Sequence, residues 1–164
     1  MANGDGANDF DFLIGDWCVT HRRLVRRLVG DTDWVEFAGP ATARKILGGL
    51  GNTDEYRIDL PEGAYLGASV RLFNPASQTW SIYWVDSRDP KLDPPVVGRF
   101  SDGRGVFLGD DTHEGTPIRV RFLWSSRPGM PYRWEQAFSI DGGASWETNW
   151  TMTFTRPGAP QARR

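Results

Sequence analysis

Apolar and polar side chains alternate with a period of two along most of this chain. The clearest example is 64–73, where Leu66, Ala68, Val70 and Leu72 share one face and the intervening residues share the other. The same alternation, with aromatic residues gathered on one face, runs through 79–86, 117–125, 132–140 and 146–156. Because successive side chains of a strand point to opposite sides of the sheet, this pattern predicts β-strands.

Turn-forming residues separate these strands at short intervals. The turn signals include Pro61-Glu62-Gly63, Asn74-Pro75-Ala76-Ser77, Pro128-Gly129-Met130-Pro131 and Asp141-Gly142-Gly143. Further strands are expected over 17–24, 32–38, 41–47, 53–60, 96–100 and 105–109. About nine or ten short strands in succession predict an all-β, antiparallel up-and-down β-barrel, because closure leaves no exposed sheet edge. A two-sheet sandwich is the alternative.

The remaining segments define the limits of the domain. Apolar residues are too clustered for a strand in 10–14, which predicts a short helical turn ended by Gly15. We expect one domain over 9–156, with disordered tails at 1–8 and 157–164. The segment 87–95 holds three prolines, so it is expected to be an irregular connection at the rim of the barrel, a candidate lid.

Composition argues against several classes of function. The chain has 19 basic and 21 acidic residues, a formal net charge of −2, and therefore no basic field to hold nucleic acid. No apolar run approaches the roughly 18 residues of a membrane span, and the polar segment 1–6 is unlike a signal peptide. The single cysteine, Cys18, cannot form an internal disulfide, which favours a reducing compartment and predicts a cytoplasmic location.

The residue types predict no metal or cofactor site. Cys18, His21 and His113 are too few and too widely spaced for a tetrahedral zinc site. The segment 110–115 is expected to be a solvated polar turn rather than a calcium site. No glycine-rich phosphate loop precedes a helix, and no serine has the setting of a nucleophile elbow.

Two further segments have a local interpretation. The segment 139–146 fits the pattern Ser-x-Asp-x-Gly-x-Ser-Trp and resembles the Asp box of sialidase propellers; since it occurs once, it predicts a hairpin staple rather than a propeller. The basic segment 21–28 would be amphipathic as a helix, but a strand is favoured because 17–22 already alternates.

Gly15-Asp16-Trp17, at the start of the first strand, resembles the Gly-x-Trp signature of the lipocalin and calycin superfamily. In that superfamily the tryptophan plugs the closed end of the barrel, and a basic residue late on the last strand packs over it. The segment Phe154-Thr155-Arg156 places Arg156 at the matching position. The resemblance therefore implies that Trp17 closes one end of the barrel.

A second resemblance covers more of the chain. It rests on the segments 10–17, Tyr83-Trp84-Val85-Asp86, 134–143 and Trp146-Glu147-Thr148-Asn149-Trp150, which are similar to a family of bacterial lipocalin-like domains without a general assigned reaction. The resemblance implies a calycin-like barrel with one small-molecule cavity and supplies no catalytic residues. Haem, which the related nitrobindins bind through a late histidine, is not expected because 132–156 contains none.

Strand parity identifies the side chains that would line such a cavity. If Trp17 points inward, then Val19, His21 and Arg23 do so too. The aromatic faces of the later strands pair large rings with hydrogen-bonding groups, which is typical of a ligand site. The predicted ligand-binding residues are His21, Arg23, Trp84, Asp86, Trp124, Trp134, Gln136 and Trp150.

These residues predict a barrel that binds a small, flat or aromatic organic molecule. The alternative is a cofactor-free enzyme, such as a cyclase or isomerase, with Asp86 or His21 transferring a proton. A third hypothesis is a structural module whose tryptophans only fill the core. A homodimer formed through a sheet edge or an exposed aromatic face is also a prediction.

Overall fold

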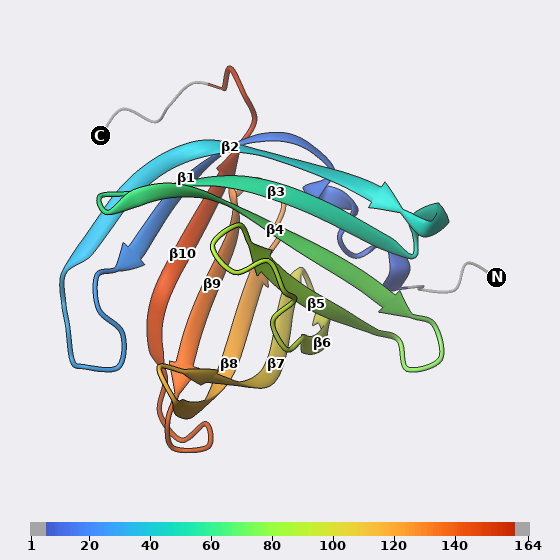
Figure 1. Ribbon diagram of the computed structural model, residues 1–164. Coiled ribbons are helices and arrows are strands. Elements are labelled where there is room, and N and C mark those ends of the chain that lie inside the picture. The colour runs from blue at the N-terminus through green and yellow to red at the C-terminus, as the bar shows by residue number, and fades with distance from the viewer. Residues whose placement is uncertain (1–5, 160–164) are drawn as a thin grey trace.

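Each strand pairs with the strands before and after it in the chain, and the last pairs with the first (Figure 1). The computed structural model describes residues 6–159. Its ten antiparallel strands are β1 (Gly15–Leu24), β2 (Trp34–Ile46), β3 (Gly51–Leu60), β4 (Gly63–Asn74), β5 (Thr79–Asp86), β6 (Val96–Ser101), β7 (Arg104–His113), β8 (Thr116–Ser125), β9 (Tyr132–Ser139) and β10 (Glu147–Thr155). The prediction of an up-and-down barrel is therefore confirmed, and the sandwich alternative is wrong.

The pairing of β1 with β10 closes the barrel. It runs antiparallel from Cys18 opposite Thr155 to Arg23 opposite Trp150. On its other side β1 pairs with β2 along its whole length. No edge is left unpaired between the first and last strands, which removes the aggregation hazard of an open sheet.

The predicted strands 32–38 and 41–47 form the single strand β2, which runs through Pro40. Proline has no backbone N–H to donate to a neighbouring strand. The pairing of β2 with β3 begins only at Ala41, opposite Tyr56, whereas Pro40 is paired on the β1 side alone. Pro40 is thus tolerated where the ladder to β3 has not yet begun.

Two short 3-10 helices, η1 (Gly6–Asn8) and η2 (Asp11–Leu13), plug one end of the barrel. Phe10 is 1% exposed and packs edge-on against Trp80, Phe100 and Trp124. The indole N–H of Trp80 donates to the carbonyl of Gly6 at 2.8 Å. The predicted helical turn is confirmed, and the barrel plug begins within the segment 1–8 that was expected to be a tail. Residues 1–5 and 160–164 of the predicted tails lie outside the described residues.

Trp17 is buried beside this plug, as the lipocalin resemblance implies. Its indole N–H donates to the carbonyl of Leu13 at 2.7 Å. The guanidinium carbon of Arg156 lies 3.6 Å from the centre of the Trp17 ring, and its nitrogens donate to the carbonyls of Ile14 and Asp16. Gly15 has φ +116°, and a Cβ there would lie 2.6 Å from the Arg156 guanidinium, so glycine is required at this position.

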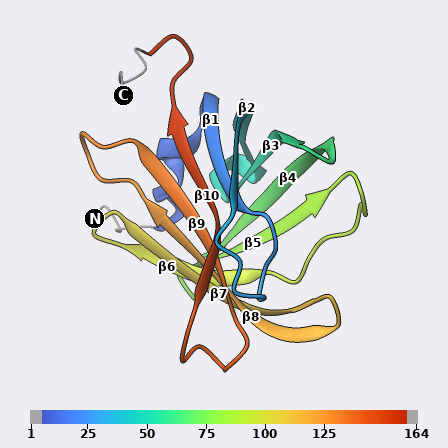
Figure 2. The same cartoon turned by 90° about the vertical axis from the view of Figure 1, so that its left-hand side faces the viewer.

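The other end of the barrel is open. Antiparallel order brings to it the connections 25–33, 61–62, 87–95, 114–115 and 140–146. Figure 2 turns this side toward the viewer and shows the β1–β2 connection, in blue, in front of the strands. None of the helices among residues 6–159 has the length and apolar character needed to cross a membrane.

Candidate functional site

A cavity of about 450 Å³ lies inside the open end of the barrel. Its walls come from β1, β5, β7, β8, β9 and β10, from the first residue of β6, and from the connections 25–33 and 87–95. The lining residues are Arg23, Arg27, Ile82, Trp84, Asp86, Arg88, Lys91, Leu92, Asp93, Pro94, Val96, Gly109, Asp110, Asp111, Thr112, His113, Ile118, Val120, Phe122, Trp134, Gln136, Phe138 and Trp150. This volume is within the range of small-molecule sites, about 300–1,000 Å³.

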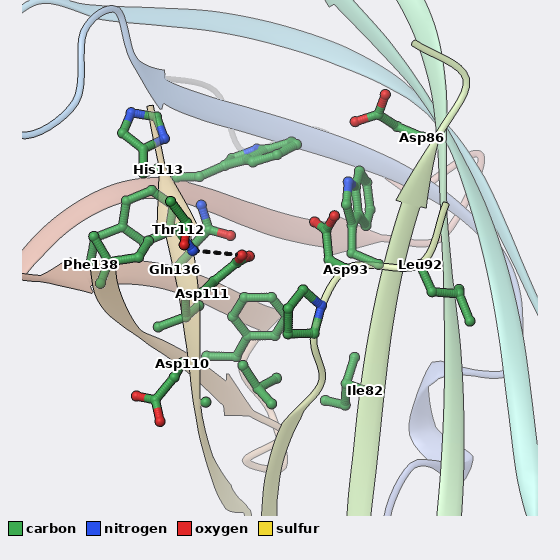
Figure 3. A pocket seen from close by; sticks show the side chains of 18 of the residues that line it. Ile82, Asp86, Leu92, Asp93, Asp110, Asp111, Thr112, His113, Gln136 and Phe138 are labelled. Atoms are coloured by element: carbon green, nitrogen blue, oxygen red, sulfur yellow. Dashed lines mark hydrogen bonds between the residues drawn. The ribbon is translucent and has the colours of Figure 1, made fainter. Parts of the chain in front are cut away.

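The cavity exists because β5 and β6 separate. They pair only at three positions, from Trp80 opposite Gly98 to Ile82 opposite Val96. Beyond Ile82 the proline-rich segment 87–95 takes the place of β6, and the backbone N–H of Asp93 donates to the carbonyl of Trp84 at 2.8 Å. The predicted rim loop is therefore a wall of the cavity, with Leu92 and Asp93 on its surface (Figure 3).

One wall of the cavity is aromatic and consists of Trp84, Phe122, Trp134 and Trp150, which form three ring-to-ring contacts. Trp150 meets Trp84 and Trp134 edge to face, with ring centres 5.8 and 5.6 Å apart. Phe122 packs edge-on against Trp134 at 5.0 Å. Each ring is packed against its neighbour, and all four of these aromatic side chains line the cavity.

Gly67 on β4 allows Trp84 its position in this wall. A Cβ at Gly67 would lie 2.3 Å from the Trp84 ring, closer than any real contact. The sequence pattern placed Gly67 only on one face of 64–73. The structure shows that this face, which also carries Tyr65, Ser69 and Arg71, is the buried one, whereas the aliphatic face points outward and leaves Leu66 45% exposed.

Arg23 and Arg27 form the basic side of the cavity. The Arg23 guanidinium lies over Trp150 at 5.1 Å and donates from Nη1 to the Tyr65 hydroxyl at 3.4 Å. The Arg27 guanidinium lies 5.5 Å from Phe138 and 6.0 Å from Trp150. The strand interpretation of the basic segment holds as far as Leu24, where β1 ends, and the connection that follows brings Arg27 to the cavity.

Carboxylates form another side of the cavity, where Asp93 on the loop and Asp111 on β7 both reach its interior (Figure 3). Burial, together with the smaller effects of the Asp111 and Asp86 charges, raises the pKa of Asp93 to about 6. Asp86 differs, because Arg88 donates to it at 2.9 Å and this hydrogen bond lowers the pKa of the Asp86 carboxyl. Asp93 is therefore the cavity carboxyl best suited to exchange a proton near neutral pH.

The structure corrects the interpretation of 110–115 as a turn. Residues 110–113 extend β7, and the turn is confined to Glu114 and Gly115. Parity on the longer strand directs Asp111 and His113 inward and leaves Asp110 and Thr112 exposed. The described residues contain no group of three or more His, Cys, Asp or Glu side chains arranged to hold a metal ion.

Six of the predicted site residues line the cavity together: Arg23, Trp84, Asp86, Trp134, Gln136 and Trp150. Gln136 is fixed by its neighbour on β10, since its amide nitrogen donates to Asn149 Oδ1 at 2.8 Å. These residues were predicted because the alternation along each strand assigned their side chains to the inward face.

His21 faces inward but does not reach the cavity. It is 1% exposed, stacks on Phe37 with ring centres 4.5 Å apart, and accepts a hydrogen bond on Nδ1 from the indole of Trp150 at 3.2 Å. Burial lowers the pKa of His21 to about 4, so the ring is neutral at pH 7. Trp150 stands between this ring and the cavity, which leaves His21 in a structural position.

Trp124 also lies outside the cavity, in the packed half of the barrel. The guanidinium of Arg71 lies 5.3 Å from the centre of the Trp124 ring. Arg71 is 2% exposed and donates from Nη2 to Asp54 at 2.6 Å and from Nη1 to Asn52 at 2.9 Å. Asp54 also accepts the hydroxyl of Tyr56, so this buried charge pair is neutralised within the fold.

Several lining residues were not predicted. Arg27 and Asp93 follow the ends of β1 and β5, where strand parity no longer applies. Asp111 would have been found if the alternation that begins at Phe107 had been extended along β7. The lining residues missed by the sequence pattern that carry charge are Arg27, Arg88, Lys91, Asp93, Asp110 and Asp111.

The hairpin staple is confirmed. Asp141 Oδ1 accepts hydrogen bonds from the Ser145 backbone N–H at 2.8 Å and from the Ser139 hydroxyl at 2.7 Å. These hydrogen bonds, led by that of the Ser145 hydroxyl, lower the pKa of Asp141 to about 2. Its carboxylate accepts hydrogen bonds within the β9–β10 connection and does not line the cavity.

Comparison with known proteins adds no family to this description. No protein-family model matches the chain, and no curated protein matches it. The function must therefore be argued from the cavity itself.

Proposed function

We propose that this protein binds a small, flat organic molecule in the cavity at the open end of the barrel. The observation that carries the proposal is a hollow of about 450 Å³ lined by three tryptophans and by charged groups. A barrel evolved only for stability would fill this space with side chains, because interiors pack to the density of organic crystals. The packed half of the same barrel, around Phe10, shows that the chain can do so.

The test is a thermal-shift screen of aromatic compounds on the wild-type protein and on a variant with a filled cavity. Val120 is 6% exposed and lines the cavity, so Val120→Trp should occupy the ligand's space. Val106, 40% exposed on β7, provides the matched control Val106→Trp. A compound at 100 times its Kd should raise the wild-type and control Tm by about 5 °C or more, and that of Val120→Trp much less. Equal shifts in all three proteins would contradict binding in the cavity.

A cofactor-free enzyme is the second candidate, favoured by Asp93. Its pKa of about 6 suits a general acid or base at neutral pH, and it lines the same cavity. Of the predicted proton-transfer groups, Asp86 is held by Arg88 and His21 is sealed behind Trp150. Once a ligand is known, NMR in D₂O should show deuterium entering it with wild-type protein and not with Asp93→Asn; no exchange with wild-type protein would contradict the enzyme hypothesis.

The relation to lipocalin-like bacterial domains belongs to the same proposal. It is supported by the closed antiparallel barrel and by the stacking of Arg156 on Trp17 at the plugged end. The cytoplasmic location, inferred from the single cysteine, and the homodimer stay predictions from the sequence.

A further inference from the structure

Arg23 and Arg27 form no close ion pair among the described residues, although the charges of Glu62 and Asp86 act on Arg23 and that of Glu147 acts on Arg27. No carboxylate of residues 6–159 lies within ion-pair distance of either guanidinium, and Arg27 donates no hydrogen bond to these residues. Arg23 Nε and Arg27 Nη2 are shielded from solvent with their hydrogen-bonding capacity unmet. Buried polar groups normally find a partner, so these donors require an explanation.

Two other arginines inside the barrel or at its mouth have a carboxylate partner, although the Nε of Arg71 also lacks a hydrogen-bond partner. Arg71 is neutralised by Asp54 at 2.6 Å, and Arg88 by Asp86 at 2.9 Å. Arg23 and Arg27 are instead close enough for the charge of Arg23 to lower the pKa of Arg27, which burial has already lowered, to about 9. Arg27 is therefore still cationic at pH 7, and the fold holds two mutually repelling cations side by side at the cavity wall.

Flat apolar surface adjoins this pair. The Arg23 guanidinium stacks on Trp150, and the rings of Trp84 and Trp134 continue the wall into the cavity. An anion placed at the two guanidiniums would extend an attached ring along these tryptophans. Guanidinium groups suit this task because their fixed fork of donors matches the two oxygens of a carboxylate.

We propose that the ligand is an aromatic carboxylate, with its carboxylate bound by Arg23 and Arg27 and its ring against Trp84, Trp134 and Trp150. This inference rests on the proposed function and adds the chemical class of the ligand. Asp93 and Asp111 on the acidic side repel an anion placed there. The cavity thus orients the molecule, with the carboxylate toward β1 and the uncharged end toward the 87–95 loop.

The experiment is isothermal titration calorimetry with 2-naphthoate and its neutral analogue 2-naphthamide. The two probes share the same ring and nearly the same shape and differ in charge. Wild-type protein should bind the naphthoate about 10- to 100-fold more tightly, the usual value of a hydrogen-bonded charge pair. Arg27→Gln and Arg23→Gln should each weaken naphthoate binding by about 10-fold or more and change naphthamide binding less than twofold.

Two neighbouring arginines provide matched controls. Arg22 pairs with Glu36 and Arg26 with Asp31, and both are exposed. Arg22→Gln and Arg26→Gln should bind both probes as the wild-type protein does, and near-ultraviolet circular dichroism would confirm that all four variants fold.

The outcomes separate the inference from the proposed function. Equal binding of both probes, or equal losses in the Arg22 and Arg23 variants, would overturn the carboxylate assignment and leave the aromatic site standing. Absence of binding of either probe to wild-type protein would count against the proposed function itself.

Discussion

At the scale of single residues, the two ends of the barrel differ in whether a buried arginine has a carboxylate partner. In the packed half, Arg71 forms an ion pair with Asp54 and donates to Asn52, so its charge is balanced within the fold although its Nε has no hydrogen-bond partner. At the cavity, neither Arg23 nor Arg27 forms an ion pair with a described residue, and each also has a nitrogen without a hydrogen-bond partner. Since an unpaired charge away from water lowers stability, the second arrangement is expected only where something else binds.

Replacing Arg27 should therefore stabilise the protein without ligand. Arg27→Met removes a desolvated cation and keeps an apolar side chain of similar length, so we expect the free energy of unfolding to rise by about 1–2 kcal/mol. Urea denaturation at pH 7 measures this change. Arg26→Met, at an exposed neighbouring position, is the control. A destabilised Arg27→Met protein would indicate that the fold itself satisfies this guanidinium.

His21 should make the stability of the protein depend on pH. Burial lowers its pKa from 6.5 to about 4, so only the unfolded chain takes up a proton between these values. The His21 contribution is fully present above pH 6.5 and is lost as the pH falls toward 4, by about 3 kcal/mol in total.

Urea denaturation between pH 7 and 4 tests this linkage. His21→Phe keeps a ring against Phe37 and should flatten the pH dependence relative to wild type, whereas His113→Asn, at the cavity rim, should retain it. Parallel curves for wild type and His21→Phe would show that His21 is not held neutral in the fold.

At the scale of elements, alternation along the chain predicted the strands and the residues that share a face, but it did not show that the aliphatic face of 64–73 points outward. It brought Arg23, Trp84, Trp134, Gln136 and Trp150 to one cavity because these residues lie within strands. It could not place Arg27 or Asp93, because both follow the last paired residue of a strand and depend on the path of a connection. Nor could alternation show which inward-facing side chains reach the cavity. His21 points inward, but Trp150 lies between it and the cavity.

The separation of β5 from β6 is a further element-scale feature that no local pattern signals. It depends on the prolines of 87–95 and on the backbone bond from Asp93 to Trp84. Trp84 is thus held by the loop on one side and by the bare backbone of Gly67 on the other.

Substitution of Gly67 should consequently damage the site. Gly67→Ala places a methyl group where the Trp84 ring now lies, so the ring must turn into the cavity. We expect a loss of about 1–3 kcal/mol in stability and at least a 10-fold loss in affinity for an aromatic ligand. Unfolding curves and calorimetry measure the two effects. Ala68→Val, on the outward face of the same strand, should change neither much.

At the scale of the whole molecule, the net charge of −2 conceals a separation of charge inside the barrel. Unpaired guanidiniums lie on the β1 side, and the Asp93 and Asp111 carboxylates lie between the 87–95 loop and β7. The plug of η1 and η2 lies at the far end, so we expect a ligand to enter through the open end, where the charged groups lie.

This charge distribution predicts that binding of an organic anion tightens as the pH falls. The pKa of Asp93 is about 6, so acidification from pH 7.5 to 5.5 neutralises it and removes repulsion from the cavity. The other charged or titratable groups lining the cavity are Arg23, Arg27, Asp86, Arg88, Lys91, Asp110, Asp111 and His113. Affinity for 2-naphthoate should rise about two- to fivefold. Asp93→Asn should bind equally at both pH values; an unchanged pH dependence in this variant would assign the effect to another group.

A crystal structure with 6-bromo-2-naphthoate tests the central claim most directly, because anomalous scattering locates the bromine without ambiguity. We predict a bromine peak inside the open half of the barrel, toward the 87–95 loop, with the carboxylate at Arg23 and Arg27. A cavity filled by side chains, or bromine found only on the outer surface at saturating concentration, would contradict it.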